Sequence, residues 1–146
     1  FPTRRSSDLV IFELKKKMKE KQHISKQLNI TLWTAQILMS ALFLWASAMK
    51  LGLSEETLAQ MWPWTAGNQE LVIFTGILDL LAGLGLVLPM ALNVVPRLSF
   101  WAAWGAAALM IAAGIFHISR GEASQTGING VVFFLAVFVG WGRGKK

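Results

Sequence analysis

The chain has 146 residues, of which 54% are hydrophobic and 15% charged, with a formal charge of +6 and a mean hydropathy of +0.50. Soluble domains carry about 25% charged residues, so this composition indicates a membrane protein of one domain. The absence of cysteine excludes a disulfide scaffold, a thiol redox enzyme and a Cys-ligated zinc or iron–sulfur site. The high apolar content excludes an intrinsically disordered chain.

The N-terminal residues do not look native. Residues 1–9 read Phe-Pro-Thr-Arg-Arg-Ser-Ser-Asp-Leu and resemble the translation of a sequencing adapter. Because such scars are left out of fold reasoning, we expect residues 1–17 to be a non-native leader and Met18 to be the native start. Residues 18–29 are then expected to be a basic tail, 30–141 the membrane domain and 142–146 a second basic tail.

Four segments are apolar enough to cross a bilayer, for which a helix needs about 20 residues. They cover residues 30–53, 71–92, 98–118 and 126–141. The first has a second interpretation as a signal peptide, but signal peptides have apolar regions of only about 7 to 15 residues. The fourth is short and also fits a buried strand, although three neighbouring spans favour a helix. The predicted fold is all-α, an integral membrane four-helix bundle.

Basic residues lie mainly on one side of this four-span arrangement. Outside the leader, that side holds Lys19, Lys21, Lys26, Arg97, Arg143, Lys145 and Lys146. The other side has only Lys50 and Arg120. The positive-inside rule therefore places both termini in the cytoplasm. Because the basic residues flank apolar segments, we expect them to contact anionic lipid, and we expect no nucleic-acid partner.

Small residues in the second and third spans predict how the helices pack. In lipid, helices associate where small residues allow close approach. Gly76, Asp79 and Gly83 follow a spacing that places them on one face of the second span. The third span repeats alanine at four-residue spacing, and Pro89 is expected to kink or end the second span.

Four polar side chains inside or beside the spans are the candidate binding or proton site. Asp79 lies near mid-membrane, and ionisable groups at that depth usually face the bundle interior. Lys50, His117 and Asn129 lie near the outer ends of their spans, so all four converge on the outer half. The alternatives are an interhelical ion pair of Asp79 with Lys50, a Lys50 amine that extends to the headgroups, and an Asn129 that caps the fourth helix.

No catalytic or metal motif occurs. The chain has no CxxCH, HExxH, Gly-rich phosphate loop or nucleophile elbow, and an autonomous enzyme is not expected. We assign no catalytic residue and no metal ligand, and a quinone is the one cofactor considered.

The motifs Trp-Ala-Ser-Ala-Met-Lys-Leu, Met-Trp-Pro-Trp, Gly-Ile-Leu-Asp-Leu-Leu-Ala-Gly-Leu-Gly-Leu-Val-Leu-Pro and Ile-Phe-His-Ile resemble the DoxX-like membrane proteins. The residues at the positions of the family pattern are Lys50, Asp79, Gly83, Pro89, His117 and Asn129. The acid in that family is often glutamate, so the aspartate side chain at position 79 is shorter than the usual one. The resemblance implies a bacterial four-helix inner-membrane protein related to membrane subunits of thiosulfate:quinone oxidoreductases.

Three functions remain open. The first is an accessory or quinone-interacting subunit of a membrane redox assembly, in which Asp79 and His117 bind a head group, Lys50 sets the charge of the carboxylate and Asn129 orients it. The second is a non-catalytic membrane scaffold in which Asp79 and Lys50 only hold helices together. The third is a small-molecule or proton carrier, which is disfavoured because inverted repeats and broken helices are not evident. The expected partners are the bilayer, a membrane or peripheral redox subunit, and a second copy of the chain.

Overall fold

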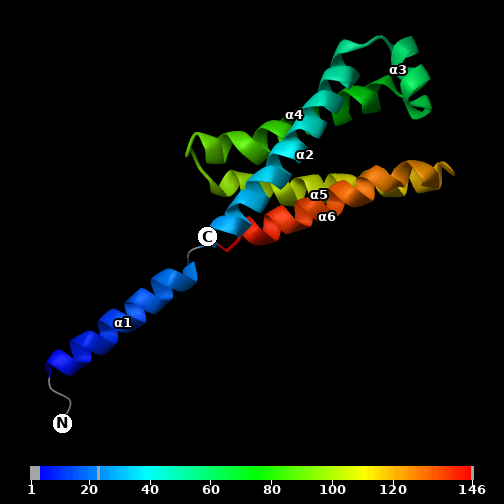
Figure 1. Ribbon diagram of the computed structural model, residues 1–146. Helices are drawn as coiled ribbons and strands as arrows, with labels where there is room; N and C mark the ends of the chain where they lie inside the picture. Colours follow the sequence, from blue (N-terminus) through cyan, green and yellow to red (C-terminus); the bar gives the residue numbers. More distant parts are fainter. Residues whose placement is uncertain (1–3, 23, 146) are drawn as a thin grey trace.

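The computed structural model describes residues 4–22 and 24–145, and this part of the chain is almost entirely helical (Figure 1). The elements in chain order are α1 (Arg4–Gln22), α2 (Lys26–Gly52), α3 (Glu55–Met61), the 3₁₀ turn η1 (Pro63–Thr65), α4 (Gln69–Ala91), α5 (Arg97–Ser119), the 3₁₀ turn η2 (Ala123–Gln125) and α6 (Thr126–Arg143). His23, expected in the basic tail, lies outside the described residues.

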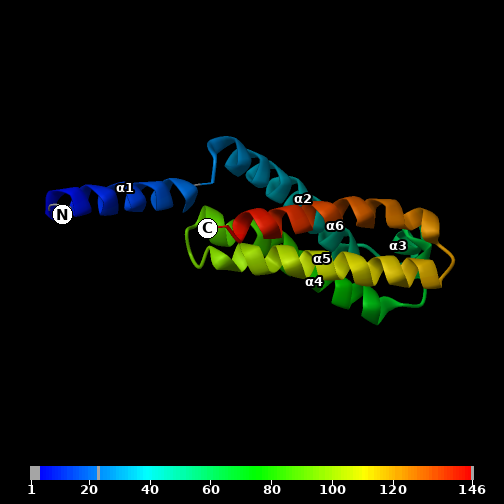
Figure 2. The same ribbon diagram turned by 90° about the horizontal axis from the view of Figure 1, so that it is seen from below.

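Four helices are long and apolar enough to cross a membrane, which confirms the predicted spans. They are α2, α4, α5 and the continuous segment Ala123–Arg143. The first span begins earlier than predicted because Ser25 caps α2, its Oγ accepting the Leu28 N–H at 3.2 Å. The predicted basic tail also contains helix, since α1 extends to Gln22. This helix projects away from the bundle (Figures 1 and 2).

The four spans form a ring of neighbours. Contacts join α2 to α4, α4 to α5, α5 to α6, and α6 back to α2. Figures 1 and 2 both show α5 and α6 side by side along their length, and Figure 1 shows the end of α6 beside the start of α2. We call this end the Arg143 end. The opposite end, where the segments 53–68 and 120–125 connect the helices, is the cavity end.

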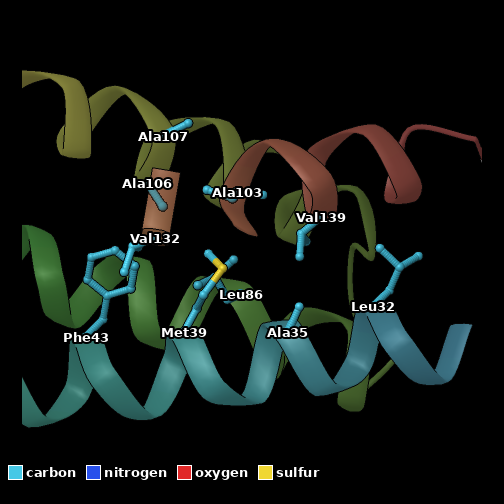
Figure 3. Packing of buried hydrophobic residues seen from close by; sticks show 11 residues of the cluster. Leu32, Ala35, Met39, Phe43, Leu86, Ala103, Ala106, Ala107, Val132 and Val139 are labelled. Carbon is cyan, nitrogen blue, oxygen red and sulfur yellow. The ribbon is translucent and has the colours of Figure 1, made fainter. Parts of the chain in front are cut away.

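The core lies between the helices toward the Arg143 end, where side chains from all four spans meet (Figure 3). It comprises Leu32, Ala35, Met39 and Phe43 of α2, Leu86 of α4, Ala103, Ala106 and Ala107 of α5, and Val132, Ala136 and Val139 of α6. Alanine supplies the whole contribution of α5. This helix therefore approaches its neighbours closely, as the alanine spacing predicted.

Small residues and polar side chains fix α2 against α4. A Cβ added to Gly83 would lie 2.8 Å from Leu44 Cγ, so only glycine fits there. At the same place Ser40 Oγ donates to the Gly83 carbonyl at 2.6 Å, and Gln36 Nε2 donates to the Leu86 carbonyl. These bonds satisfy side chains that are buried in the bundle, where an unpaired polar group is costly.

Arg143 connects α6 to α2 at the Arg143 end of the bundle. Arg143 belongs to the segment that was expected to be a basic tail. In the structure it is the last residue of α6 and is only 4% exposed. Its Nε donates to Gln36 Oε1 and its Nη1 to Asn29 Oδ1, both at 2.7 Å. The guanidinium also lies over the Trp33 ring, 5.3 Å from its centroid. The end of α6 is thereby tied to α2, and through Gln36 to α4.

Replacing Gly83 by Leu should destabilise the bundle by about 1–3 kcal/mol, the usual cost of overpacking. The added side chain would collide with Leu44 and separate α2 from α4. Thermal unfolding in detergent measures the loss. The matched control is Gly105→Leu, because a Cβ at Gly105 meets nothing within 4 Å. Equal stability of the two variants would contradict the close approach of α2 and α4.

Candidate functional site

A cavity of about 600 Å³ opens at the cavity end of the bundle. All four spans and the segment 53–68 contribute to its lining. Most lining side chains are apolar, and the polar ones are few: Lys50, Thr75, Asp79, His117, Glu122, Gln125 and Asn129. A mostly apolar pocket of this size with a few convergent polar groups is typical of small-molecule sites.

Lys50 and Asp79 form an ion pair in the wall of the cavity. Lys50 Nζ lies 2.7 Å from Asp79 Oδ2, and the two side chains are 13% and 5% exposed. Lys50 therefore does not extend to the headgroups, and the contact between α2 and α4 is the interhelical pair that the sequence left open. The aliphatic part of Lys50 lies against Gly76, where an added Cβ would be 3.1 Å from Lys50 Cβ.

A second set of ionisable side chains, which contains His117, Arg120 and Glu122, lies where α5 ends. Glu122 Oε2 lies 3.0 Å from His117 Nδ1, and its Oε1 accepts the Arg120 Nε–H at 3.2 Å. Gly121 makes this return possible because it adopts φ +75°, a left-handed conformation that favours glycine. The Glu122 N–H also donates to the His117 carbonyl at 2.8 Å. The carboxylate is thus held against the imidazole by both backbone and side chain.

Trp64 covers the two charged groups from the connecting segment. Its ring packs edge-on against Phe116 and His117, with centroids 5.8 and 6.4 Å apart, and Lys50 Nζ lies 5.6 Å from its centroid. Glu55 Oε1 stabilises the segment by accepting the Gly67 N–H at 3.1 Å. The segment therefore forms an aromatic wall that contacts both α2 and α5.

Asn129 provides an uncommitted polar group. It lies in the first turns of α6 and lines the cavity. Its Nδ2 is buried and has no hydrogen-bond partner among the described residues. It does not cap α6, since Gln125 occupies the N-cap position. Buried polar groups are normally paired, so this amide is available to a ligand.

The four candidate residues of the sequence all line one cavity, but they are not one contact cluster. Lys50 pairs with Asp79, while His117 pairs with Glu122. Sequence reasoning missed Glu122, because acids in loops carry little information about topology. The sequence did contain one signal. Gly121 lies four residues after His117 and directly before Glu122, and a glycine there permits a turn that brings the acid back to the imidazole.

The described residues contain no group of three or more His, Cys, Asp or Glu side chains that could hold a metal ion. The polar groups of the cavity can instead form hydrogen bonds. They comprise an ion pair, an imidazole fixed by a carboxylate, and a free amide, all within an apolar and aromatic wall. This set can donate hydrogen bonds to a ligand and accept them from it.

Lowering the pH should weaken the connection between α5 and α6. The hydrogen bond with His117, and then that with Arg120, lowers the pKa of Glu122. A carboxyl with a lowered pKa in the folded state stabilises the fold above its unfolded pKa, and this contribution is lost as the pH falls through the lowered value. Thermal unfolding between about pH 6 and pH 3 should show this loss. Glu122→Gln should show a smaller change, and an equal change would contradict the assignment.

Comparison with known proteins gives one match. The profile of the DoxX-like family covers residues 34–139, which is more than half of the chain and includes all four spans in whole or in part. Searches among curated proteins and among solved structures gave no match. The family match contains Lys50, Asp79, His117 and Asn129, and it confirms the family that the sequence motifs predicted. The chain is therefore a multi-pass membrane protein that belongs to the DoxX-like family.

Proposed function

We propose that this protein binds a quinone-type compound in its cavity and serves as an accessory, quinone-interacting subunit of a membrane redox assembly. The observation that carries the proposal is the cavity itself. Its volume of about 600 Å³ lies within the range of small-molecule sites, roughly 300–1,000 Å³. A substituted quinone ring with part of its tail is of this size class.

The lining supports an aromatic occupant. Trp45, Trp62, Trp64, Phe74 and Phe116 surround the space. Trp45 and Trp62 pack edge to face with their centroids 5.8 Å apart. Aromatic walls favour flat rings through stacked and edge-on contacts. A quinone ring would find such contacts on several sides.

The polar groups support an occupant with oxygen atoms. The Asn129 amide has no partner of its own, and His117 and Lys50 lie in the wall with nitrogen atoms that can bond to an oxygen. Asp79 holds Lys50 in place, so the ammonium is oriented before a ligand enters. In this proposal a partner subunit supplies the electron acceptor or donor.

The four spans would lie in a bacterial inner membrane with both termini in the cytoplasm, because the basic residues of the chain flank the Arg143 end. The cavity would then open in the outer half of the membrane. A redox subunit on that side or within the membrane would be the partner.

A non-catalytic scaffold is the second candidate, and the Lys50–Asp79 contact favours it. Two charges at 2.7 Å that satisfy each other between α2 and α4 can serve packing alone. In this case the cavity would hold only lipid. The two candidates differ in what co-purifies with the protein and in how the ion pair responds to mutation.

Filling the cavity should remove its ligand. Ala113 lines the cavity and Ala108, on the same helix, is exposed outside it. We expect mass spectrometry of protein extracted together with its surrounding lipid in polymer-bounded native discs, without detergent, to find a quinone-type compound at near-stoichiometric amounts in the wild type and in Ala108→Phe. Ala113→Phe should lose the quinone, and Asp79→Asn should reduce it. Phospholipid alone in all four samples would overturn the proposal.

Replacing one residue of the Lys50–Asp79 ion pair should destabilise the protein at least as much as replacing both. Lys50→Met or Asp79→Leu alone leaves one buried charge unpaired and should destabilise the bundle by about 3 kcal/mol. The double variant should be no less stable than either single one, and unfolding in detergent gives the double-mutant cycle. Lys26→Met, which removes an exposed charge from the same helix, is the control. Additive losses would show that the pair does not couple α2 to α4.

A further inference from the structure

Glu122 fixes the orientation of the His117 imidazole at the cavity. The imidazole directs Nδ1 at Glu122 Oε2, 3.0 Å away. An ionised carboxylate only accepts hydrogen bonds, so Nδ1 must carry the hydrogen. In the neutral ring the second nitrogen, Nε2, is then an acceptor without a hydrogen. Glu122 therefore determines which hydrogen-bonding group His117 offers.

Glu122 is held firmly enough to do this. Its backbone N–H donates to the His117 carbonyl at 2.8 Å, and Arg120 Nε donates to its second carboxylate oxygen at 3.2 Å. These two bonds fix the carboxylate on one side of the ring. Arg120 itself packs over Phe116 at 5.5 Å, which keeps the guanidinium in position.

The other ring nitrogen, Nε2, has no hydrogen-bond partner among the described residues. His117 lines the cavity. Its Nε2 is not one of the fully buried atoms. The wall thus presents an acceptor at this point. A carboxylate–imidazole pair that directs one ring nitrogen at a ligand is a common way to fix the tautomer of a histidine.

We infer that the cavity binds the hydroxyl-bearing, reduced form of its ring compound, a quinol, in preference to the quinone. This rests on the proposed function and specifies its ligand. A quinol hydroxyl donates to His117 Nε2, whereas a quinone carbonyl would bring its lone pairs against the lone pair of Nε2. Glu122 is then a positioning residue, because it acts on the ligand through His117.

The other polar groups of the wall do not remove this preference. The Lys50 ammonium can donate to the oxygen of either form, and the Asn129 amide, which has no bond to fix it, can turn either end toward the ligand. Asp79 provides a further acceptor, which also favours a hydroxyl. His117 is therefore the group that separates the two forms.

The first test compares the two forms of one compound. We would titrate 2-methyl-1,4-naphthoquinone and its quinol into the full chain in lipid nanodiscs, anaerobically and at pH 8.5. Calorimetry should show the quinol bound at least about fivefold more tightly, the effect of one hydrogen bond made or left unsatisfied. Glu122→Leu should lose this difference. Glu70→Leu, which removes an exposed carboxylate that does not line the cavity, should keep it.

The second test reads the tautomer directly and needs no ligand. The chain has two histidines, so His23→Gln leaves His117 as the single ¹⁵N-labelled ring. The wild-type ring should show a protonated Nδ1 and an unprotonated Nε2, and Glu122→Leu should shift the hydrogen toward Nε2. A wild-type ring protonated on Nε2 would overturn the inference, whatever the binding data show.

The outcomes separate this inference from the proposed function. Equal affinity of the wild type for both forms, abolished by Ala113→Phe, would overturn the inference and leave quinone binding intact. Binding of neither form would overturn both. A quinol preference that Glu122→Leu removes, together with the expected tautomer, would establish both.

Discussion

Close approach of α2 and α4 is the constraint on which the rest of the structure depends. In a bilayer, burying leucine adds little, and helices are held together by close backbone contact and hydrogen bonds. Here Gly83 provides the contact, and Ser40 bonds its carbonyl across the interface at 2.6 Å. This fixes the register of the two helices. Lys50 Cβ lies against Gly76, three residues before Asp79 on α4. Because helical side chains lean toward the N-terminus of their helix, the Lys50 amine reaches the carboxylate.

Buried cations at the two ends of the bundle have different kinds of partner. At the Arg143 end, a buried cation is bonded to two neutral amide oxygens, of Gln36 and Asn29, and no described carboxylate approaches it within ion-pair distance. At the cavity end, the Lys50 ammonium in the wall pairs with the Asp79 carboxylate, and the nearby Arg120 pairs with Glu122. The neutral network lies beside the packed core, whereas the Lys50–Asp79 pair lies in the wall of the cavity.

Much of the fold could be predicted from composition and periodicity. Four apolar stretches of span length can only be helices in lipid, and the family motifs identified Lys50, Asp79, His117 and Asn129. Arg143 was misplaced because the sequence shows a charge near the end of the chain but not which side of the last helical turn faces inward. Glu122 was missed because its role depends on the turn at Gly121, which is a backbone conformation and leaves no trace in hydropathy. How far apart the four candidate residues lie also could not be predicted, since the tilt of the spans sets those distances.

The rim of the cavity has a consequence for how any occupant is measured. Phe74, Ile128 and Trp45 line it and are respectively 59%, 57% and 48% exposed on the outer surface of apolar spans. Such surfaces face acyl chains, so the opening communicates with the hydrocarbon of the bilayer. A lipophilic ring compound partitions into that phase before it binds. Its occupancy would then follow its mole fraction in the lipid, and dilution into a large excess of micelles would empty the site without any change in the protein.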